Sequence, residues 1–312
     1  PAALLSLWFA GKAGAWENYF FEAQVAVTLA ASLALARMQG SAPARAEGGA
    51  LRQAAVPLLV LLQVALMWHT PRDAQRYLRL TAESNEALAP ILAATPDPIF
   101  AEDMGLLVTS GKKLDYCSFQ YSQLARAGRW DQAWELGQLR RRAVNLVVLE
   151  RGTRLDVDRY QRFTREFLSE LDRNYRHEAT VGKYELYRPD PLQREVQLPF
   201  GSDLALAGWS LEGLAGTTLE AGRPLTVTVV WQARQAPAAA YTAFAHLVDE
   251  AGRGWAGDDH QPYGGLYPAT AWAAGEMVRD SFSLTVPADA PPGLYYLQVG
   301  WYNPEDGERL PV

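Results

Sequence analysis

The sequence predicts an α+β protein of several domains: a transmembrane helical hairpin, a small α/β domain and an antiparallel β-sandwich of the Ig-like or jelly-roll-like kind. Three observations predict this organisation. Two apolar runs, residues 19–37 and 54–68, precede a long and mostly polar remainder. Helix-like and strand-like patterns then alternate, and from residue 196 onward the hydrophobic period changes to two. We therefore divide the chain into domains at residues 1–70, 71–190 and 191–312.

The two apolar runs have the properties of a membrane hairpin. About 20 residues at 1.5 Å each span the hydrocarbon core, which residues 19–37 satisfy. Residues 54–68 are shorter and span it only if the flanking Gln53 and His69 sit at the interfaces. Arginines flank both sides of the hairpin, so charge alone does not orient it. A buried hairpin of a soluble protein is the competing interpretation.

The chain begins at Pro1, already inside an apolar stretch. We therefore interpret it as the C-terminal part of a longer polytopic protein, with its upstream membrane helices missing from this sequence. Its last residues, 310–312, are expected to fall inside or just before a strand, so the sandwich is expected to be truncated.

Composition excludes some classes of function. A net charge of -6 and a pI near 5.4 argue against a nucleic-acid partner, which selects a basic face. The basic run at residues 140–142 is interpreted as a solvated helix end. Cys117 is the single cysteine, so neither an intrachain disulfide nor a zinc site built on a cysteine pair is expected.

The middle of the chain, residues 71–190, is expected to form a small α/β layer domain, because strands and helices alternate. The patterns predict helices over residues 72–89, 120–127, 130–142 and 158–174, and strands over residues 99–101, 106–108, 145–150, 176–181 and 183–188. Pro90 is expected to end the first helix. Ala74, Tyr77, Leu78 and Leu88 are expected on its apolar face, and Trp130, Ala133 and Trp134 on that of the third.

One stretch of this domain, residues 109–113 (TSGKK), faintly resembles a phosphate-binding loop. The pattern fails because Gly105 is one residue too far from Gly111, and because Lys113 occupies the position of the magnesium-binding hydroxyl. A turn at the end of a strand is the preferred interpretation.

The C-terminal segment is expected to be a β-sandwich. Alternating residues predict strands over residues 204–211, 225–231, 242–248, 277–286 and 295–301, separated by turns rich in Gly, Pro and Asp. Asp249, Asp258, Asp259 and His260 gather near these turns, and we interpret them as turn residues more readily than as a calcium or sugar site. His246 with Asp249 lacks a nucleophile on a sharp turn, so we do not interpret it as a hydrolase triad.

Several stretches together resemble one family. Residues 14–22 (GAWENYFFE), 97–103 (DPIFAED) and 182–189 (GKYELYRP) are similar to segments of large bacterial membrane glycosyltransferases of the GT-C superfamily. These are the Chloroflexi-type relatives of protein O-mannosyltransferases and of aminoarabinose transferases. Many members of this family carry an appended β-sandwich, and several stretches of the present C-terminal segment are similar to it. These stretches are residues 244–249 (FAHLVD), 259–262 (DHQP), 267–272 (YPATAW), 275–276 (GE) and 292–295 (PGLY).

The resemblance implies an enzyme that moves a sugar from a polyprenyl-phosphate donor to an extracytoplasmic acceptor, in the carbohydrate or cell-envelope class. It implies a multi-pass protein of the cell membrane with extracytoplasmic C-terminal domains. The family's catalytic acidic residues lie upstream, so none is assigned here and the fragment alone is expected to be inactive. No cofactor is evident, and a divalent metal in the parent enzyme stays open.

The loop before the first apolar run is the candidate substrate-binding site, since the family's topology places it on the active-site side. Its candidate residues are Lys12, Glu17, Asn18, Tyr19 and Glu22. A lysine at the membrane surface suits a lipid phosphate, and the polar side chains suit sugar hydroxyls. Helix capping by Asn18 and interfacial anchoring by Tyr19 explain the same residues equally well.

Two other functions stay open. The chain is alternatively a non-enzymatic, membrane-anchored surface protein whose sandwich binds carbohydrate or a protein partner. A purely structural spacer is the third interpretation.

Overall fold

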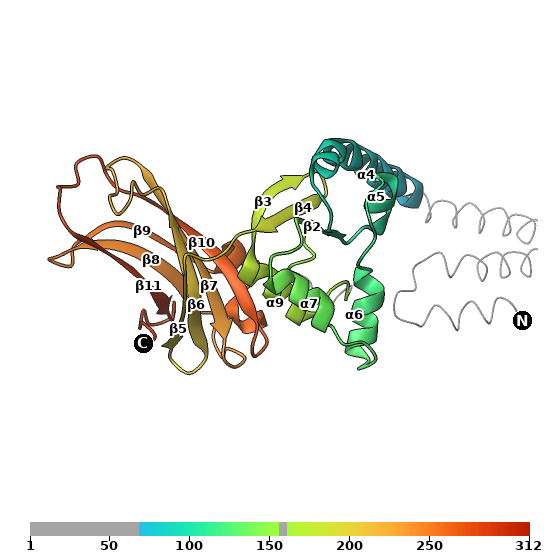
Figure 1. Cartoon of the computed structure of the whole chain (residues 1–312). Helices are drawn as coiled ribbons and strands as arrows, with labels where there is room; N and C mark the ends of the chain where they lie inside the picture. Colours follow the sequence, from blue (N-terminus) through green and yellow to red (C-terminus); the bar gives the residue numbers. More distant parts are fainter. Residues whose placement is uncertain (1–68, 156–160) are drawn as a thin grey trace, which may run out of the picture. The chain divides into compact units, whose positions relative to one another are not determined.

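The computed structural model describes residues 69–155 and 161–312. The chain divides into two compact units, Pro1–Ala82 and Glu83–Val312, and the second carries the architecture discussed below (Figure 1). Both predicted membrane-spanning runs lie outside the described residues. Among the residues that are described, none of the helices combines the length and the apolar character needed to cross a bilayer.

The α/β layer is built on a mixed four-stranded sheet of order β1-β2-β4-β3. β1 and β2 run parallel, whereas β2 pairs with β4 and β4 with β3 in antiparallel fashion. The strands are β1 (Ile99–Ala101), β2 (Leu146–Glu150), β3 (Tyr175–Val181) and β4 (Tyr184–Pro189). This confirms the mixed α/β character and four of the five predicted strands.

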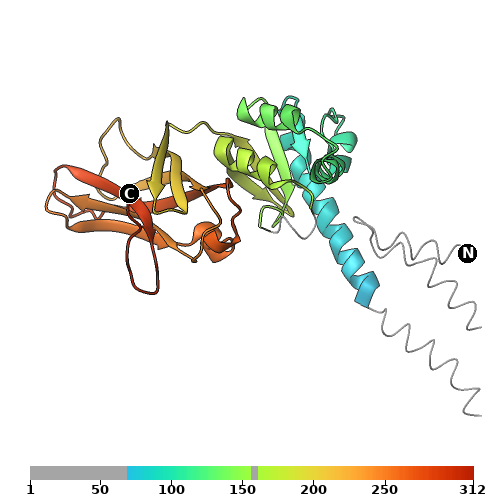
Figure 2. The same ribbon diagram turned by 90° about the horizontal axis from the view of Figure 1, so that it is seen from below.

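Helices cover both faces of this sheet (Figures 1 and 2). They are α4 (His69–Ala94), α5 (Met104–Thr109), α6 (Ser118–Arg126), α7 (Ala133–Arg140) and α9 (Arg165–Asn174). Ile99 and Val148 pack toward Leu88 and Leu92 of α4 on one face. The opposite face packs against α7 and α9, whose amphipathic sequence buries Phe167 and its neighbours.

Three local predictions for this layer are wrong. Residues 106–108 belong to helix α5 rather than a strand, because the Asp103 side chain caps that helix by accepting from Gly105 N. A short apolar run does not by itself distinguish the two conformations. α4 continues through Pro90, held by Leu88 and Leu92, which are fully buried one turn apart. α9 begins at Arg165 rather than at the predicted residue 158. The side chain of Thr164 caps this helix by accepting from Phe167 N.

Of the two predicted apolar faces, that of α4 is right at Leu88, which is buried, and that of α7 is wrong. Tyr77 and Leu78 of α4 are exposed. Trp130 and Trp134 are 38% and 46% exposed. α7 instead buries Leu136 and Leu139. Helical periodicity located these helices, but the position of the sheet decided which stripe became buried.

The C-terminal part is sandwich-like, with antiparallel sheets of order β10-β7-β6-β5 and β11-β8-β9. The strands are β5 (Arg194–Phe200), β6 (Leu204–Glu212), β7 (Pro224–Ala233), β8 (Thr242–Asp249), β9 (Gly254–His260), β10 (Met277–Thr285) and β11 (Tyr295–Tyr302). Two 3-10 turns, η2 (Pro262–Gly265) and η3 (Ala269–Ala271), connect β9 to β10. A core that includes Trp231, Trp272 and Trp301 lies between the sheets.

The predicted period of two in β7 is confirmed, since Leu225, Val227 and Val229 all face the core. Two strands were missed. β5 contains Pro199 and a register irregularity, and β9 (GWAGDDH) has few apolar residues. Both lie at sheet edges, where one side of the strand has no partner and the hydrophobic alternation is weak.

Candidate functional site: a cleft between the α/β layer and the sandwich

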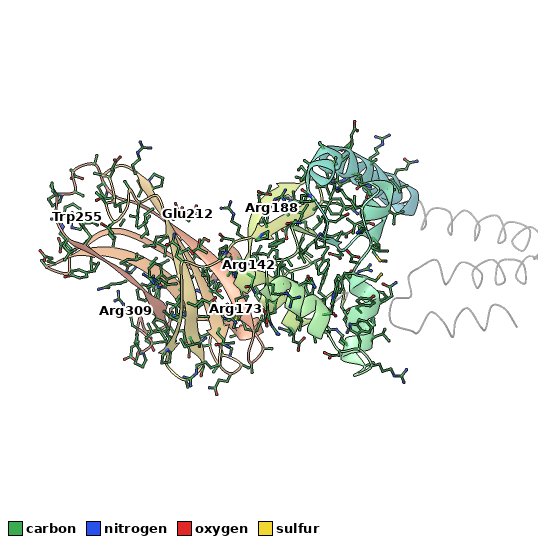
Figure 3. All side chains as sticks on the ribbon, viewed as in Figure 1. Arg142, Arg173, Arg188, Glu212, Trp255 and Arg309 are labelled. Atoms are coloured by element: carbon green, nitrogen blue, oxygen red, sulfur yellow. The ribbon has the colours of Figure 1, made fainter. Side chains whose placement is uncertain are left out.

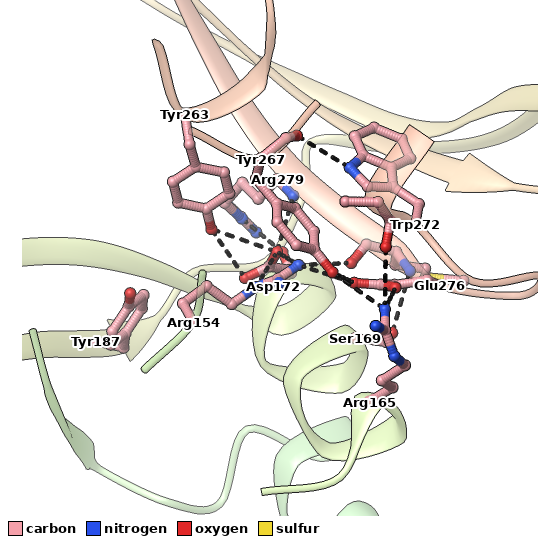
Figure 4. A network of polar contacts seen from close by, with 12 residues as sticks. Arg154, Arg165, Ser169, Asp172, Tyr187, Tyr263, Tyr267, Trp272, Glu276 and Arg279 are labelled. Carbon is pink, nitrogen blue, oxygen red and sulfur yellow. Dashed lines mark hydrogen bonds and ion pairs between the residues drawn. The ribbon is translucent and has the colours of Figure 1, made fainter. Parts of the chain in front are cut away.

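A buried ion-pair cluster, which we call the Arg154 network, joins the α/β layer to the sandwich (Figure 4). Arg154 follows β2 and is only 1% exposed. Its Nε and Nη2 atoms donate to Asp172 Oδ2 of α9 over 3.0 and 2.7 Å. Nη2 also lies 3.5 Å from Glu276 Oε1, just before β10. The guanidinium therefore bridges a carboxylate of each module.

Aromatic and cationic neighbours complete the network. The Arg154 guanidinium lies 4.7 Å from the ring centre of Tyr267, within cation–π range. Tyr267 donates its hydroxyl to Glu276 Oε1 over 2.6 Å, and Arg165 Nη1 reaches Glu276 Oε2 over 2.8 Å. Burial alone would lower the pKa of Arg154, but the charge of Asp172 raises it well above its ordinary value. The cation is therefore retained in the interior.

Arg279 of β10 forms a second link between the modules. Its Nε and Nη2 atoms donate to the carbonyl oxygens of Asp172 and Arg173, over 2.8 and 3.2 Å, at the end of α9. A cation at this position complements the helix dipole. Nη1 pairs with Asp190 Oδ2 over 2.6 Å. These contacts fix the sandwich edge against the last turn of α9.

A cleft of about 400 Å³ lies beside these links, between the α/β sheet and the outer face of the sandwich. Its volume is within the range of small-molecule sites, which often occur between domains. The lining residues are Asp172, Tyr175, Arg176, His177, Tyr187 and Asp190 from the α/β side, and Glu212, Thr226, Thr228, Tyr263, Arg279, Asp280 and Ser281 from the sandwich.

The tyrosines of the cleft contribute ring surface more than hydroxyl groups. Tyr187 donates its hydroxyl to Glu185 Oε2, Tyr263 donates to Asp172, and the Tyr175 oxygen accepts from Val144 N. Burial raises the pKa of Tyr175 to about 12, so its phenol stays neutral. Tyr175 and Tyr187 are almost wholly buried, so the partly buried ring of Tyr263 supplies most of the aromatic surface of the cleft.

Each of the four carboxylates in the cleft has a protein cation nearby, and three of them are paired more closely than Glu212, which lies 3.7 Å from Arg176. Asp172 pairs with Arg154 and Asp190 with Arg279. Asp280 Oδ1 lies 3.1 Å from His260 Nε2. The hydrogen bond that His260 donates to Asp280, supported by Asp258, raises the pKa of His260 to about 9, so the imidazole is protonated near neutral pH. Each of these carboxylates therefore accepts from a protein cation, while burial raises the pKa of Asp172 above its ordinary value.

Hydroxyl groups line the sandwich side of the cleft. Thr226 and Thr228 of β7 alternate with core residues, so their side chains point away from the sandwich interior. Ser281 of β10 lies beside Thr228, with 3.3 Å between the two hydroxyl oxygens. This row of hydroxyls can donate or accept hydrogen bonds as a ligand requires.

The candidate residues predicted from the sequence, Lys12, Glu17, Asn18, Tyr19 and Glu22, all lie outside the described residues. Of the residues interpreted as turn residues, Asp258, Asp259 and His260 lie in strand β9 and pair with β8, so the prediction is wrong for them. Asp249 Oδ1 accepts from Ala251 N and Arg253 N, which is turn geometry, as predicted.

His246 contacts Asp259 over 2.6 Å rather than Asp249, so the rejected triad is not assembled. Lys112, from the loop that resembles a phosphate site, donates its Nζ to Thr95 O at the end of α4. Across residues 69–155 and 161–312, we find no group of three or more His, Cys, Asp or Glu side chains arranged to hold a metal ion.

Sequence reasoning missed both the Arg154 network and the cleft. A signal was present, because Tyr267 and Glu276 belong to the short stretches on which the resemblance rests. The stretches 97–103 and 182–189 also meet, since Tyr184 donates its hydroxyl to Asp103 Oδ2 over 3.0 Å. The pattern marked these residues, but only the fold shows what they contact.

Comparison with known proteins does not identify a family for this chain. No protein-family profile matches the sequence, and no curated protein matches it. Among solved structures, the crystal structure of the C-terminal domain of wzt is similar at 13% sequence identity and a TM-score of 0.28. The match covers 38% of this chain and 75% of that chain.

Proposed function

We propose that Glu83–Val312 is a saccharide-binding module, carried by a membrane glycosyltransferase that uses a polyprenyl-phosphate sugar donor. The observation that supports the binding role is the cleft, which places aromatic rings, hydroxyl groups and carboxylates around about 400 Å³. The glycosyltransferase part of the proposal rests on the sequence resemblance alone.

The lining chemistry suits a sugar. A pyranose has apolar C–H faces that pack on aromatic rings, and hydroxyl groups around its edge. The partly buried ring of Tyr263, which lines the cleft, offers the first kind of contact. Thr226 and Ser281 offer exchangeable donors and acceptors, and the Asp190 carboxyl oxygens can accept from hydroxyl groups. Because the Arg154 network and Arg279 fix the walls, the cleft is preorganised, which lowers the cost of binding.

The proposal includes the finer architecture. In it, residues 1–70 form the transmembrane helical hairpin, the sandwich is Ig-like or jelly-roll-like, and both folded modules are extracytoplasmic in a multi-pass membrane protein. Lys12 and its neighbours would then face the lipid-linked donor, and the cleft would hold the carbohydrate acceptor or growing product.

A second candidate is the membrane-anchored surface protein without enzymatic activity. In this candidate the cleft only binds, and the pairing of Asp172, Asp190 and Asp280 with cations fits that role. General acid–base catalysis needs a group that can exchange a proton with the substrate, whereas each of these carboxylates is engaged by a protein cation. The cleft itself is therefore suited to binding in both candidates, and they differ only in the activity of the complete protein.

The experiment is a glycan-binding screen with the full chain purified in a mild detergent. Thr226→Trp places an indole in the cleft and is expected to weaken binding of any positive glycan at least tenfold, about 1.4 kcal/mol. Thr285→Trp is the matched control, since Thr285 is exposed on the adjacent strand β10 and does not line the cleft. Absence of glycan binding, or equal loss in both variants, would refute the binding role.

The two candidates are separated by a transfer assay. Membranes containing the complete gene product are supplied with a radiolabelled polyprenyl-phosphate sugar, and incorporation into envelope carbohydrate is measured. Transfer supports the glycosyltransferase. Glycan binding without transfer supports the anchored binding protein.

A further inference from the structure

Each carboxylate in the cleft lies near a protein cation, and one of these ion pairs is far more exposed to solvent than the others. Asp172, Asp190 and Asp280 each have a cation that is itself wholly or largely enclosed by protein. Glu212 and Arg176 instead face each other from opposite walls, one at the end of β6 and the other on β3. This pair is 50% exposed at Arg176 and 59% at Glu212.

The contact between these two side chains is loose. Arg176 Nη1 lies 3.7 Å from Glu212 Oε1, which is beyond hydrogen-bond distance. By contrast, the guanidinium of Arg279 donates hydrogen bonds to Asp190 and to carbonyl oxygens of α9. Of the two arginines in the cleft, Arg176 therefore keeps its guanidinium donors available for a ligand.

We propose that the saccharide bound in the cleft carries an oxyanion group, and that Arg176 binds this group in place of Glu212. This inference rests on the proposed saccharide-binding function and names its ligand class: an acidic sugar bearing a carboxylate or a phosphate. Glu212 holds the guanidinium across the cleft in the free protein and is displaced when the ligand enters.

The energetics favour such an exchange. An exposed ion pair contributes about 0–1 kcal/mol, so its loss costs little. A guanidinium forms two parallel hydrogen bonds with a carboxylate or phosphate, and charge-assisted bonds of this kind are about twice as strong as neutral ones. The ligand oxyanion would gain these bonds while the sugar ring contacts the tyrosine surface beside it.

The test compares three ligands of one disaccharide: the neutral glucose form, the form ending in glucuronic acid and the form carrying a phosphate. Affinities are measured with the full chain in detergent by isothermal titration. The wild type is expected to prefer one or both acidic forms over the neutral form at least tenfold. That preference is expected to shrink as salt increases.

Two variants examine the residues directly. R176Q is expected to reduce the ratio of acidic to neutral affinity at least tenfold. E212Q is expected to raise that ratio threefold or more, because it removes the carboxylate that competes for Arg176. The matched controls are R173Q and E195Q, which alter an ion pair of 3.0 Å between the same two modules (Figure 3 labels Arg173 and Glu212). Neither residue lines the cleft, so the ratio should not change.

The outcomes separate this inference from the function on which it rests. Equal binding of acidic and neutral forms, or an unchanged ratio in R176Q, overturns the inference and leaves saccharide binding intact. Failure of all three ligands, together with a negative glycan screen, removes the proposed function and this inference with it. A preference for the carboxylate over the phosphate, or the reverse, identifies the oxyanion.

Discussion

Replacing Arg154 with methionine leaves two buried carboxylates, Asp172 and Glu276, without the cation that bridges them. Removing one partner of a buried ion pair costs about 3–5 kcal/mol, because the other charge stays desolvated. Asp172 keeps Arg279 N as a donor at 3.3 Å, and Glu276 keeps Arg165 at 2.8 Å. We therefore expect the lower end of the range, about 3 kcal/mol. For a unit of this size, about 2–4 °C per kcal/mol gives a melting temperature lower by about 6–12 °C.

The assay is thermal and urea unfolding of the full chain in detergent, followed by tryptophan fluorescence. Trp272 and Trp301 are buried in the sandwich core and report its unfolding. Arg223→Met is the control, since Arg223 forms an exposed pair with Glu220 and its loss should cost less than about 1 kcal/mol. Combining Arg154→Met with Asp172→Asn should cost less than the sum of the single changes, because the uncompensated charge is gone. The reasoning fails if Arg154→Met costs no more than Arg223→Met.

Two further predictions concern stability. His260 has a folded-state pKa of about 9 against an ordinary value of 6.5, so its contribution to the free energy of unfolding is complete below pH 6.5 and declines as pH rises through 9. Urea unfolding at pH 6 and pH 9.5 measures this decline, and His260→Gln should flatten it; an unchanged decline in the variant contradicts the assignment. Gly182→Ala should cost more than about 1 kcal/mol in urea unfolding, because Gly182 has φ +58° and an added Cβ would collide with Ser84. Gly152→Ala is the control, because Gly152 has φ +88° and open space around an added Cβ, so its cost comes from backbone strain alone. An equal loss of stability in both variants would show that the contact with Ser84 adds no cost in Gly182→Ala.

Strong hydrophobic patterns in the sequence predicted much of the fold. β2 is a run of buried apolar residues, β7 alternates at a period of two, and both were located correctly. The prediction was weakest where the local pattern fits more than one structure. The run at 106–108 became a helix only because Asp103 lies where it can cap the first turn. Strand β9 was not predicted, because its backbone pairs with β8 while its side chains are mostly polar and show no hydrophobic alternation.

The site was far less predictable than the fold. Asp172 sits on an amphipathic helix, where a polar residue is normally solvent-exposed, and nothing local marks it as buried. Its partners are 18 and 107 residues away in sequence, at Arg154 and Arg279. Charges this far apart in sequence meet only when two hydrophobic cores have formed and brought their edges together.

The sequence alone determined the alternation of helices and strands, the change of period toward a sandwich and the acidic balance that disfavours nucleic acid. Each of these follows from side-chain chemistry read over a few neighbouring positions. Tertiary structure decided which apolar stripes were buried, which acidic residues became paired and where a cleft opened between the modules. Those outcomes depend on long-range packing, since the cost of burying a charge is offset only by a partner that the fold brings to it.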